Sequence, residues 1–230
     1  MQIRAISLDL DDTLWPIAPI VQRAEQRLHD WLLQHCPPVA QAYPVAQMRQ
    51  LRDRIALENP HLAHDFTAQR KLCLGAALNP HGYGDDMIEA AFDAFYAARN
   101  EVELYADALP ALQRLAARVP LISLSNGNAD LGRIGLRHLF ADCVTAREFG
   151  LAKPAPEIFL EACRRLGLAP GSVLHVGDDP LLDVHGARAA GLPCAWLNRH
   201  GTAWAQAQRP DLEFTDLTGL ADWLDYKFAA

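Results

Sequence analysis

Near the start of the sequence, an apolar run leads directly into a cluster of carboxylates: Ile3-Arg4-Ala5-Ile6-Ser7-Leu8-Asp9-Leu10-Asp11-Asp12-Thr13-Leu14. The run predicts a short buried β-strand that ends at the first acid. Three carboxylates within four residues at the end of a buried strand repel one another and lose hydration. A bound divalent cation, or chemistry that needs a carboxylate held out of water, would compensate this cost. The alternative interpretation is an acidic turn that caps a helix.

The composition is that of an ordinary globular protein, with 230 residues of which 50% are hydrophobic and 21% are charged. The net charge is -7 and no basic run is present, so we do not expect nucleic acid as a partner. The five cysteines are scattered, which argues against a disulfide framework or a zinc site and favours buried thiols. Neither a signal peptide nor a membrane span is apparent, and we therefore expect a cytoplasmic protein without a membrane partner.

The hydrophobic pattern divides the chain into two parts. Residues 18–104 carry only helical periodicity, whereas strand-length apolar runs alternate with helical patterns from about residue 105 onward. The predicted strands lie at 119–125, 143–145, 173–176, 194–197 and 213–215. Strands that alternate with helices indicate a parallel sheet covered on both faces. We predict a doubly wound α/β core formed by residues 1–17 and 105–230, with an all-helical domain of residues 18–104 inserted after the first strand.

Ser125-Asn126-Gly127 follows the second predicted strand, at the point where the strand meets a helix. The hydroxyl of Ser125, the amide of Asn126 and the neighbouring backbone N–H groups suit an anion. An ordinary turn with Ser125 or Asn126 as a helix cap is the alternative. Further along the chain, Lys153 precedes a rigid segment in which Pro156 begins a helix.

The strand predicted at 173–176 runs into Gly177-Asp178, and Asp183 lies five residues later in the first turns of the next helix. Active sites of open α/β sheets form at the carboxyl ends of the strands. We therefore expect Asp178 and Asp183 to lie near Asp9 and Asp11.

These four segments together resemble the motifs of the haloacid dehalogenase superfamily. Asp9-Leu10-Asp11-Asp12-Thr13 is similar to the first motif, Ser125 to the second, Lys153-Pro154-Ala155-Pro156 to the third, and Gly177-Asp178 with Asp183 to the fourth. The resemblance extends over the whole chain. It implies a Rossmann-like core with a helical cap of the C1 type.

Within the superfamily, the sequence is most similar to bacterial phosphatases that act on flavin mononucleotide (FMN) and on 5-amino-6-(5-phosphoribitylamino)uracil. The similarity is carried by Ser-Asn-Gly-Asn at 125–128, His-Val-Gly-Asp-Asp at 175–179 and Cys-Ala-Trp-Leu at 194–197. The inserted domain resembles this subgroup around His64 and Arg70, which implies that these two side chains contact the substrate.

The resemblance implies an Mg²⁺-dependent phosphatase that hydrolyses a small phosphorylated metabolite. Asp9 is expected to attack phosphorus and form an aspartyl-phosphate, and Asp11 to protonate the leaving group and then activate water. Phosphate binding is expected from Ser125, Asn126 and Lys153. The metal site is expected to include Asp9, the backbone carbonyl of Asp11, Asp178 and Asp183, with Asp183 in an outer position.

Several alternatives stay open at this point. The dehalogenase branch lacks the second aspartate and is therefore disfavoured by Asp11, whereas a sugar phosphomutase would use the same four motifs. A catalytically idle, ligand-binding member would share the fold. His61 and His64 have the i, i+3 spacing of two metal ligands, but no third ligand is evident and a structural or substrate-facing role is favoured. Trp15 is expected either to cover a planar ring or to pack at the hinge near residues 16–19, which leads into the inserted domain.

Overall fold

The computed structural model describes residues 2–229, which form two compact units. The α/β unit extends up to Pro16, over Glu103–Gly127 and from Leu131 onward. The helical unit comprises Ile17–Val102 together with the short segment Asn128–Asp130. The predicted domain boundaries differ from these by one or two residues, and the sequence pattern did not predict the segment 128–130.

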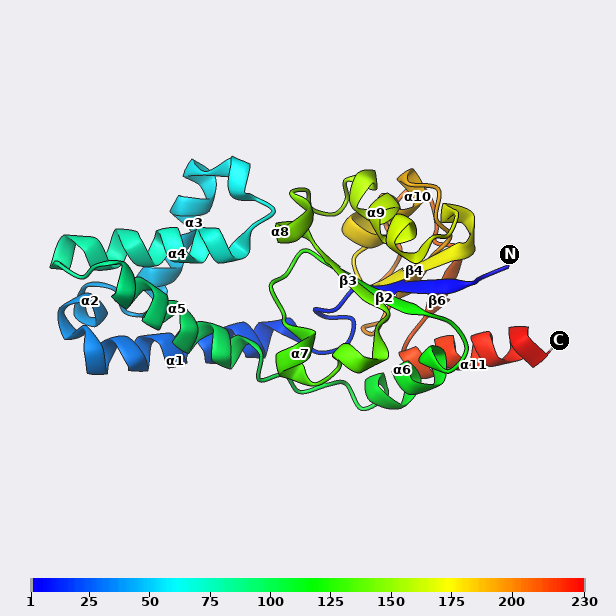
Figure 1. Cartoon of the computed structure of the whole chain (residues 1–230), viewed down its shortest axis with the longest axis horizontal. Helices are drawn as coiled ribbons and strands as arrows, with labels where there is room; N and C mark the ends of the chain where they lie inside the picture. The colour runs from blue at the N-terminus through cyan, green and yellow to red at the C-terminus, as the bar shows by residue number, and fades with distance from the viewer. Residues whose placement is uncertain (1, 230) are drawn as a thin grey trace. The chain divides into compact units, whose positions relative to one another are not determined.

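The α/β unit is built on one sheet of six parallel strands in the order β3-β2-β1-β4-β5-β6, shown in Figure 1. This confirms the predicted doubly wound α/β fold. Every residue of β1, β2, β4 and β5 is buried, as expected for strands covered on both faces. The strands are β1 (Ala5–Leu8), β2 (Leu121–Ser125), β3 (Asp142–Thr145), β4 (Val173–Gly177), β5 (Cys194–Leu197) and β6 (Leu212–Phe214).

Helices cover both faces of this sheet (Figure 1). On one face, apolar side chains of α9 (Pro156–Leu166) and α10 (Gly186–Ala189) pack on the strands. On the other face, α6 (Ala108–Ala116) packs against α11 (Leu217–Ala229). The helix expected around Asp183 is divided into the π-helical segment η5 (Pro180–His185) and α10. The shorter helices of the unit are α7 (Leu131–Ile134), η3 (Arg137–Leu139), α8 (Ala146–Phe149) and η4 (Pro170–Ser172).

The helical unit packs its own apolar core, which includes Leu28, Leu74 and Phe92. Its helices are α1 (Ile17–His35), α2 (Pro37–Ala42), α3 (Val45–Glu58), η1 (Pro60–Leu62), α4 (Phe66–Leu78), η2 (Asn79–His81) and α5 (Asp85–Arg99). The prolines at 37 and 38 follow the end of α1 and begin α2, because proline is well accommodated in the first turn of a helix.

The chain order of the strands creates the position of the site. From β1, the chain passes to its neighbour β2 on one side and later to its neighbour β4 on the other. Leu8 is in register with Ser123 of β2 and with Val176 of β4. The residues that follow β1 and β4 therefore emerge side by side at the point where the strand order reverses, which is where open α/β sheets bind ligands.

Two further expectations concern the thiols and the membrane. All five cysteines are free, and four of them are buried, as the sequence predicted. Within residues 2–229, none of the helices combines the length and the apolar character needed to cross a membrane.

Candidate active site

Asp9 is the first residue after β1, and only 7% of its surface is exposed. Its Oδ1 atom accepts a hydrogen bond from Nζ of Lys153 at 2.5 Å. The same ammonium group donates to Oδ1 of Asp183 at 2.6 Å. A lysine this deeply buried is rare unless it is paired, and here it is held by two carboxylates. The structure therefore brings three of the predicted site residues into direct contact.

Asp183 is locked in place by contacts to both of its carboxylate oxygens. Oδ1 also lies 3.1 Å from Nε2 of His175, and Oδ2 accepts the backbone N–H of Asp179 at 3.0 Å. Nδ1 of His175 lies 3.1 Å from the Ser7 hydroxyl, so this histidine is a satisfied core residue. A Cβ atom at Gly177 would lie 2.2 Å from Cγ of Asp183, which explains why glycine ends β4.

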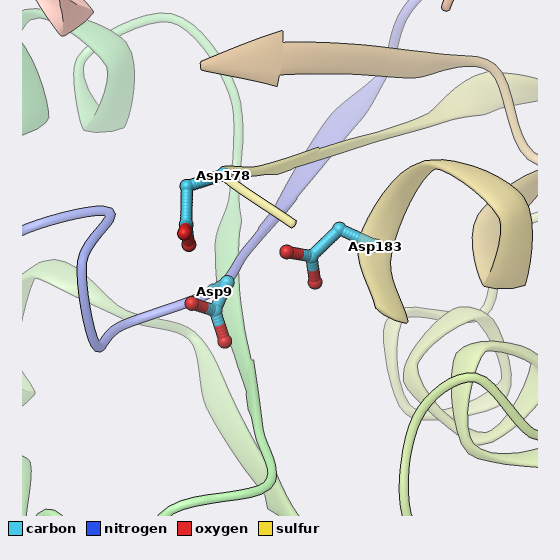
Figure 2. Close-up of side chains that lie close together, drawn as sticks. All are labelled: Asp9, Asp178 and Asp183. Carbon is cyan, nitrogen blue, oxygen red and sulfur yellow. The ribbon is translucent and has the colours of Figure 1, made fainter. Parts of the chain in front are cut away.

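Asp178 follows β4 and points toward Asp9 (Figure 2). The buried hydroxyl of Thr13 lies 3.1 Å from Oδ1 of Asp178 and 3.3 Å from Oδ2 of Asp9. A hydroxyl has one proton to donate, so Thr13 can serve only one of the two carboxylates at a time. Thr13 lies within the first motif, and this position is the sequence signal that points to the site.

Burial and mutual repulsion perturb these acids. Burial raises the pKa of Asp9 well above its usual value despite the opposing charge of Lys153. Burial, with the charges of Asp183 and Asp12, raises the pKa of Asp178 to about 7. Burial would also raise the pKa of Asp183, but Lys153 and His175 outweigh it, and this pKa lies below the ordinary range.

The three carboxylates can hold a metal ion. The side chains of Asp9, Asp178 and Asp183 lie close together (Figure 2), and each offers an oxygen atom in a set whose members lie within 4.8 Å of one another. Among the described residues, no other group of three or more acidic, histidine or cysteine side chains has this arrangement. Carboxylate oxygens are the donors that hard divalent cations prefer. The raised pKa values of Asp9 and Asp178 indicate that their ionised forms are unfavourable in this site. A bound cation would compensate this negative charge.

The second motif holds the third one in place. Both amide atoms of Asn126 bind the backbone of Lys153: Nδ2 donates to its carbonyl at 2.9 Å, and Oδ1 accepts its N–H at 2.7 Å. Asn126 thus positions Lys153, and the phosphate contact expected for this amide stays a prediction. The buried hydroxyl oxygen of Ser125, at the end of β2, accepts the N–H of Gly127 at 3.0 Å.

Asp11 lies in the same loop as Asp9, and its side chain is half-buried. Its Oδ1 atom accepts a hydrogen bond from the indole N–H of Trp15 at 2.8 Å. Trp15 is fully buried, and its indole is bound to a predicted catalytic residue. Beside Asp178, a cavity of about 300 Å³ is lined by Asp12, Trp196, Arg199 and other residues of the same unit.

The candidate substrate residues of the inserted domain have different surroundings. Arg70, on α4, is 6% exposed, and its guanidinium lies 4.1 Å from the ring centroid of Phe95 and 3.8 Å from Glu25. It is thus part of the interior of the helical unit. His64 lies in the turn before α4 and is half-buried, and His61 lies in η1 and is exposed.

Comparison with known proteins gives consistent matches over most of the chain. The model of the haloacid dehalogenase-like hydrolases matches residues 3–191. A 5-amino-6-(5-phospho-D-ribitylamino)uracil phosphatase of Escherichia coli, YigB, is 28% identical over 227 residues, with 95% of each chain covered. A phosphoserine phosphatase of Thermus thermophilus is 34% identical over 61% of this chain and 59% of its own length.

Solved structures agree on the fold. The crystal structure of a protein described as a 2-haloacid dehalogenase from Pseudomonas syringae superposes with a TM-score of 0.91 at 36% identity, covering 98% of this chain and 100% of the other. The four motifs, the strand order and the match over residues 3–191 agree. The chain belongs to the haloacid dehalogenase-like hydrolases.

Proposed function

We propose that the protein is an Mg²⁺-dependent phosphatase that hydrolyses a small phosphorylated metabolite through an aspartyl-phosphate on Asp9. The observation that carries this proposal is the buried contact of Asp9 with Lys153, with Asp178 alongside and Asp11 in the same loop. A dianionic phosphate needs positive charge at the nucleophile, and Lys153 together with a divalent cation supplies it. The similarity to the E. coli phosphatase over nearly the full length supports the same reaction class.

Each residue has a role that its contacts support. Asp9 is the nucleophile, and Lys153 compensates its charge and that of the phosphoryl oxygens. Ser125 binds the phosphoryl group, and Asn126 keeps Lys153 in place. Asp183 fixes the ammonium of Lys153 by accepting a second hydrogen bond from it.

The metal would be held by the carboxylates of Asp9 and Asp178 and by the backbone carbonyl of Asp11, while Asp183 supports Lys153 rather than binding the ion directly. When bound, Mg²⁺ offsets the repulsion between the phosphate and the anionic nucleophile. Asp11 protonates the leaving oxygen and then takes a proton from the attacking water.

The substrates we propose are FMN or the phosphorylated ribitylamino-pyrimidine precursor of riboflavin. The supporting observation is the match with the E. coli phosphatase, whose name gives the second of these compounds. His64 and Arg70 stay candidate substrate contacts; the burial of Arg70 beside Phe95 favours His64 of the two.

Haloacid dehalogenation is the second candidate, because the Pseudomonas syringae structure carries that description. Dehalogenation also uses a nucleophilic aspartate, but no alkoxide has to be protonated when a halide leaves. The presence of Asp11, bound by Trp15 in the nucleophile's own loop, favours the phosphatase.

A single preparation can separate the two reactions. We would measure phosphate release from FMN, the ribitylamino-pyrimidine phosphate, phosphoserine and p-nitrophenyl phosphate, and halide release from 2-chloropropionate, each with Mg²⁺ and with chelator. We expect phosphate release that requires Mg²⁺ and disappears in Asp9→Asn, and no halide release. Halide release without phosphate release would overturn the proposal in favour of the dehalogenase.

A further inference from the structure

The indole of Trp15 makes a specific contact with the proposed general acid. Its Nε1–H group donates to Oδ1 of Asp11 at 2.8 Å, and the ring is fully buried. A buried tryptophan generally places its N–H against a partner, and many buried tryptophans use a backbone carbonyl for this purpose. Trp196 does so with the carbonyl of Asp178, at 2.7 Å. The partner of Trp15, in contrast, is the side chain that the mechanism requires to move a proton.

The backbone around Trp15 is tightly connected, so the indole has a defined position. The N–H of Asp12 donates to the Trp15 carbonyl at 2.8 Å, and the N–H of Leu14 donates to the Leu10 carbonyl at 2.8 Å. Asp12 adopts the left-handed conformation with φ of 59°, which turns the chain back on itself. The loop thereby places Trp15 beside Asp11, four residues earlier in the chain.

The loop is also attached to the rest of the α/β unit. The N–H of Tyr105 donates to the Leu14 carbonyl at 3.0 Å. The guanidinium of Arg199 donates to the Thr13 carbonyl at 2.9 Å and pairs with Asp107. Since Thr13 and Leu14, the two residues that precede Trp15, are held from outside the loop, the indole is a fixed donor to which the more exposed Asp11 carboxyl is attached.

We propose that Trp15 is a positioning residue that holds the Asp11 carboxyl in the orientation needed for proton transfer. An indole N–H can only donate, so Oδ1 of Asp11 is the acceptor and the transferred proton is carried on Oδ2. This inference rests on the proposed phosphatase function.

In the first step, Asp9 forms a bond to phosphorus, the bond from phosphorus to the leaving oxygen breaks, and the proton on Oδ2 of Asp11 passes to that oxygen. In the second step, water attacks phosphorus, the bond to Asp9 breaks, and the proton from water returns to Oδ2.

The dependence of the rate on the leaving group tests this role. Trp15→Phe removes the N–H donor and keeps an aromatic ring. Alkyl phosphates need a protonated leaving oxygen, whereas p-nitrophenolate leaves without one. General acid catalysis contributes about 10²- to 10⁴-fold, and a misplaced group forfeits part of this factor. We expect kcat/KM to fall at least about tenfold for an alkyl phosphate such as FMN and less than about threefold for p-nitrophenyl phosphate.

A double-mutant cycle separates positioning from loss of structure. In the Asp11→Asn background there is no proton to deliver, so adding Trp15→Phe is expected to change neither rate further. Trp223→Phe, on α11 and 6.3 Å from the ring of Phe214, is the matched control and is expected to leave both rates unchanged. If Trp15→Phe does not fold, Trp15→Leu, which also lacks a side-chain donor, provides the same comparison.

The outcomes distinguish this inference from the proposed function. A selective loss on the alkyl ester, absent in the Asp11→Asn background, supports the positioning role. Equal losses on both esters, or an undiminished loss in the Asp11→Asn background, would overturn it while the phosphatase stands. A wild-type protein that hydrolyses neither ester with Mg²⁺ present would instead overturn the proposed function.

Discussion

Replacing Lys153 with methionine removes one buried positive charge from a group of three carboxylates. The ammonium lies 2.5 Å from Asp9 and 2.6 Å from Asp183, and all three side chains are at least 90% buried. Removing one partner of a buried ion pair typically costs about 3–5 kcal/mol, because the remaining charge is left without compensation. We expect Lys153→Met to lower the free energy of unfolding by about this amount at pH 8 without metal.

The pH dependence of this loss follows from proton uptake. In the wild type, burial would raise the pKa of Asp183, but Lys153 lowers it, so Asp183 stays charged and stabilises the folded state above its unfolded pKa. Without Lys153, a buried carboxyl has a pKa above its unfolded value, and the folded state binds a proton that the unfolded state does not. The stability of the variant therefore rises as the pH falls, by up to about 1.4 kcal/mol per pH unit.

Urea unfolding at pH 8, 6.5 and 5 in the presence of chelator measures both quantities. Four of the five tryptophans, namely Trp15, Trp196, Trp204 and Trp223, belong to the α/β unit, so intrinsic fluorescence reports mainly on the unit that contains Lys153.

Lys71→Met is the matched control. Its ion pair with Glu89 is as short, at 2.6 Å, but the side chains are 33% and 57% exposed. Exposed pairs contribute about 0–1 kcal/mol, so we expect a small loss without this pH dependence. A loss below about 1 kcal/mol for Lys153→Met at pH 8, or an equal loss at pH 5, would refute the reasoning.

Three further predictions concern the same unit. Because the pKa of Asp178 is about 7, protons compete with Mg²⁺ for this carboxylate below neutral pH. Calorimetry should give an affinity for Mg²⁺ that falls by up to about tenfold per pH unit between pH 7 and 5, and a constant affinity would contradict this. Gly177→Ala would place a methyl carbon 2.2 Å from a carboxyl carbon and should lower stability in urea by at least about 1–3 kcal/mol, whereas Gly171→Ala, with no neighbouring atom within 4 Å, should not. Arg199→Lys cannot reproduce the two-pronged contact with Asp107 and should cost about 1–3 kcal/mol in urea unfolding; an unchanged midpoint would argue against a structural role.

The arrangement of the site was predictable wherever it depends on topology. Parallel strands place their carboxyl ends at one edge, so the positions of Asp9 and Asp178 in the sequence were sufficient to predict that they meet. The burial of Lys153 was predictable in the same way, since the converging acids require a cation. The strand boundaries followed from apolar runs, because every position in the central strands is buried.

Other features depend on side-chain geometry that no sequence periodicity records. The amide of Asn126 binds the backbone of Lys153, 27 residues away in the chain, and the indole of Trp15 binds Asp11. The helix after Asp179 is divided into η5 and α10. The division lies where the Asp183 side chain packs against Gly177 and accepts a hydrogen bond from Lys153. The contacts of His64 and Arg70 likewise depend on how side chains project, so the similarity of these positions to a subgroup did not predict the burial of Arg70.

The most direct test of the central claim is to trap the phosphorylated protein. Protein mixed with a ³²P-labelled phosphate ester and Mg²⁺ is quenched in acid within the first turnover, digested and mapped by mass spectrometry. The account predicts an acid-stable, hydroxylamine-labile phosphoryl group on the peptide that contains Asp9, absent with chelator and absent in Asp9→Asn. A label on another residue, or ester hydrolysis in which Asp9→Asn matches the wild type, would contradict it.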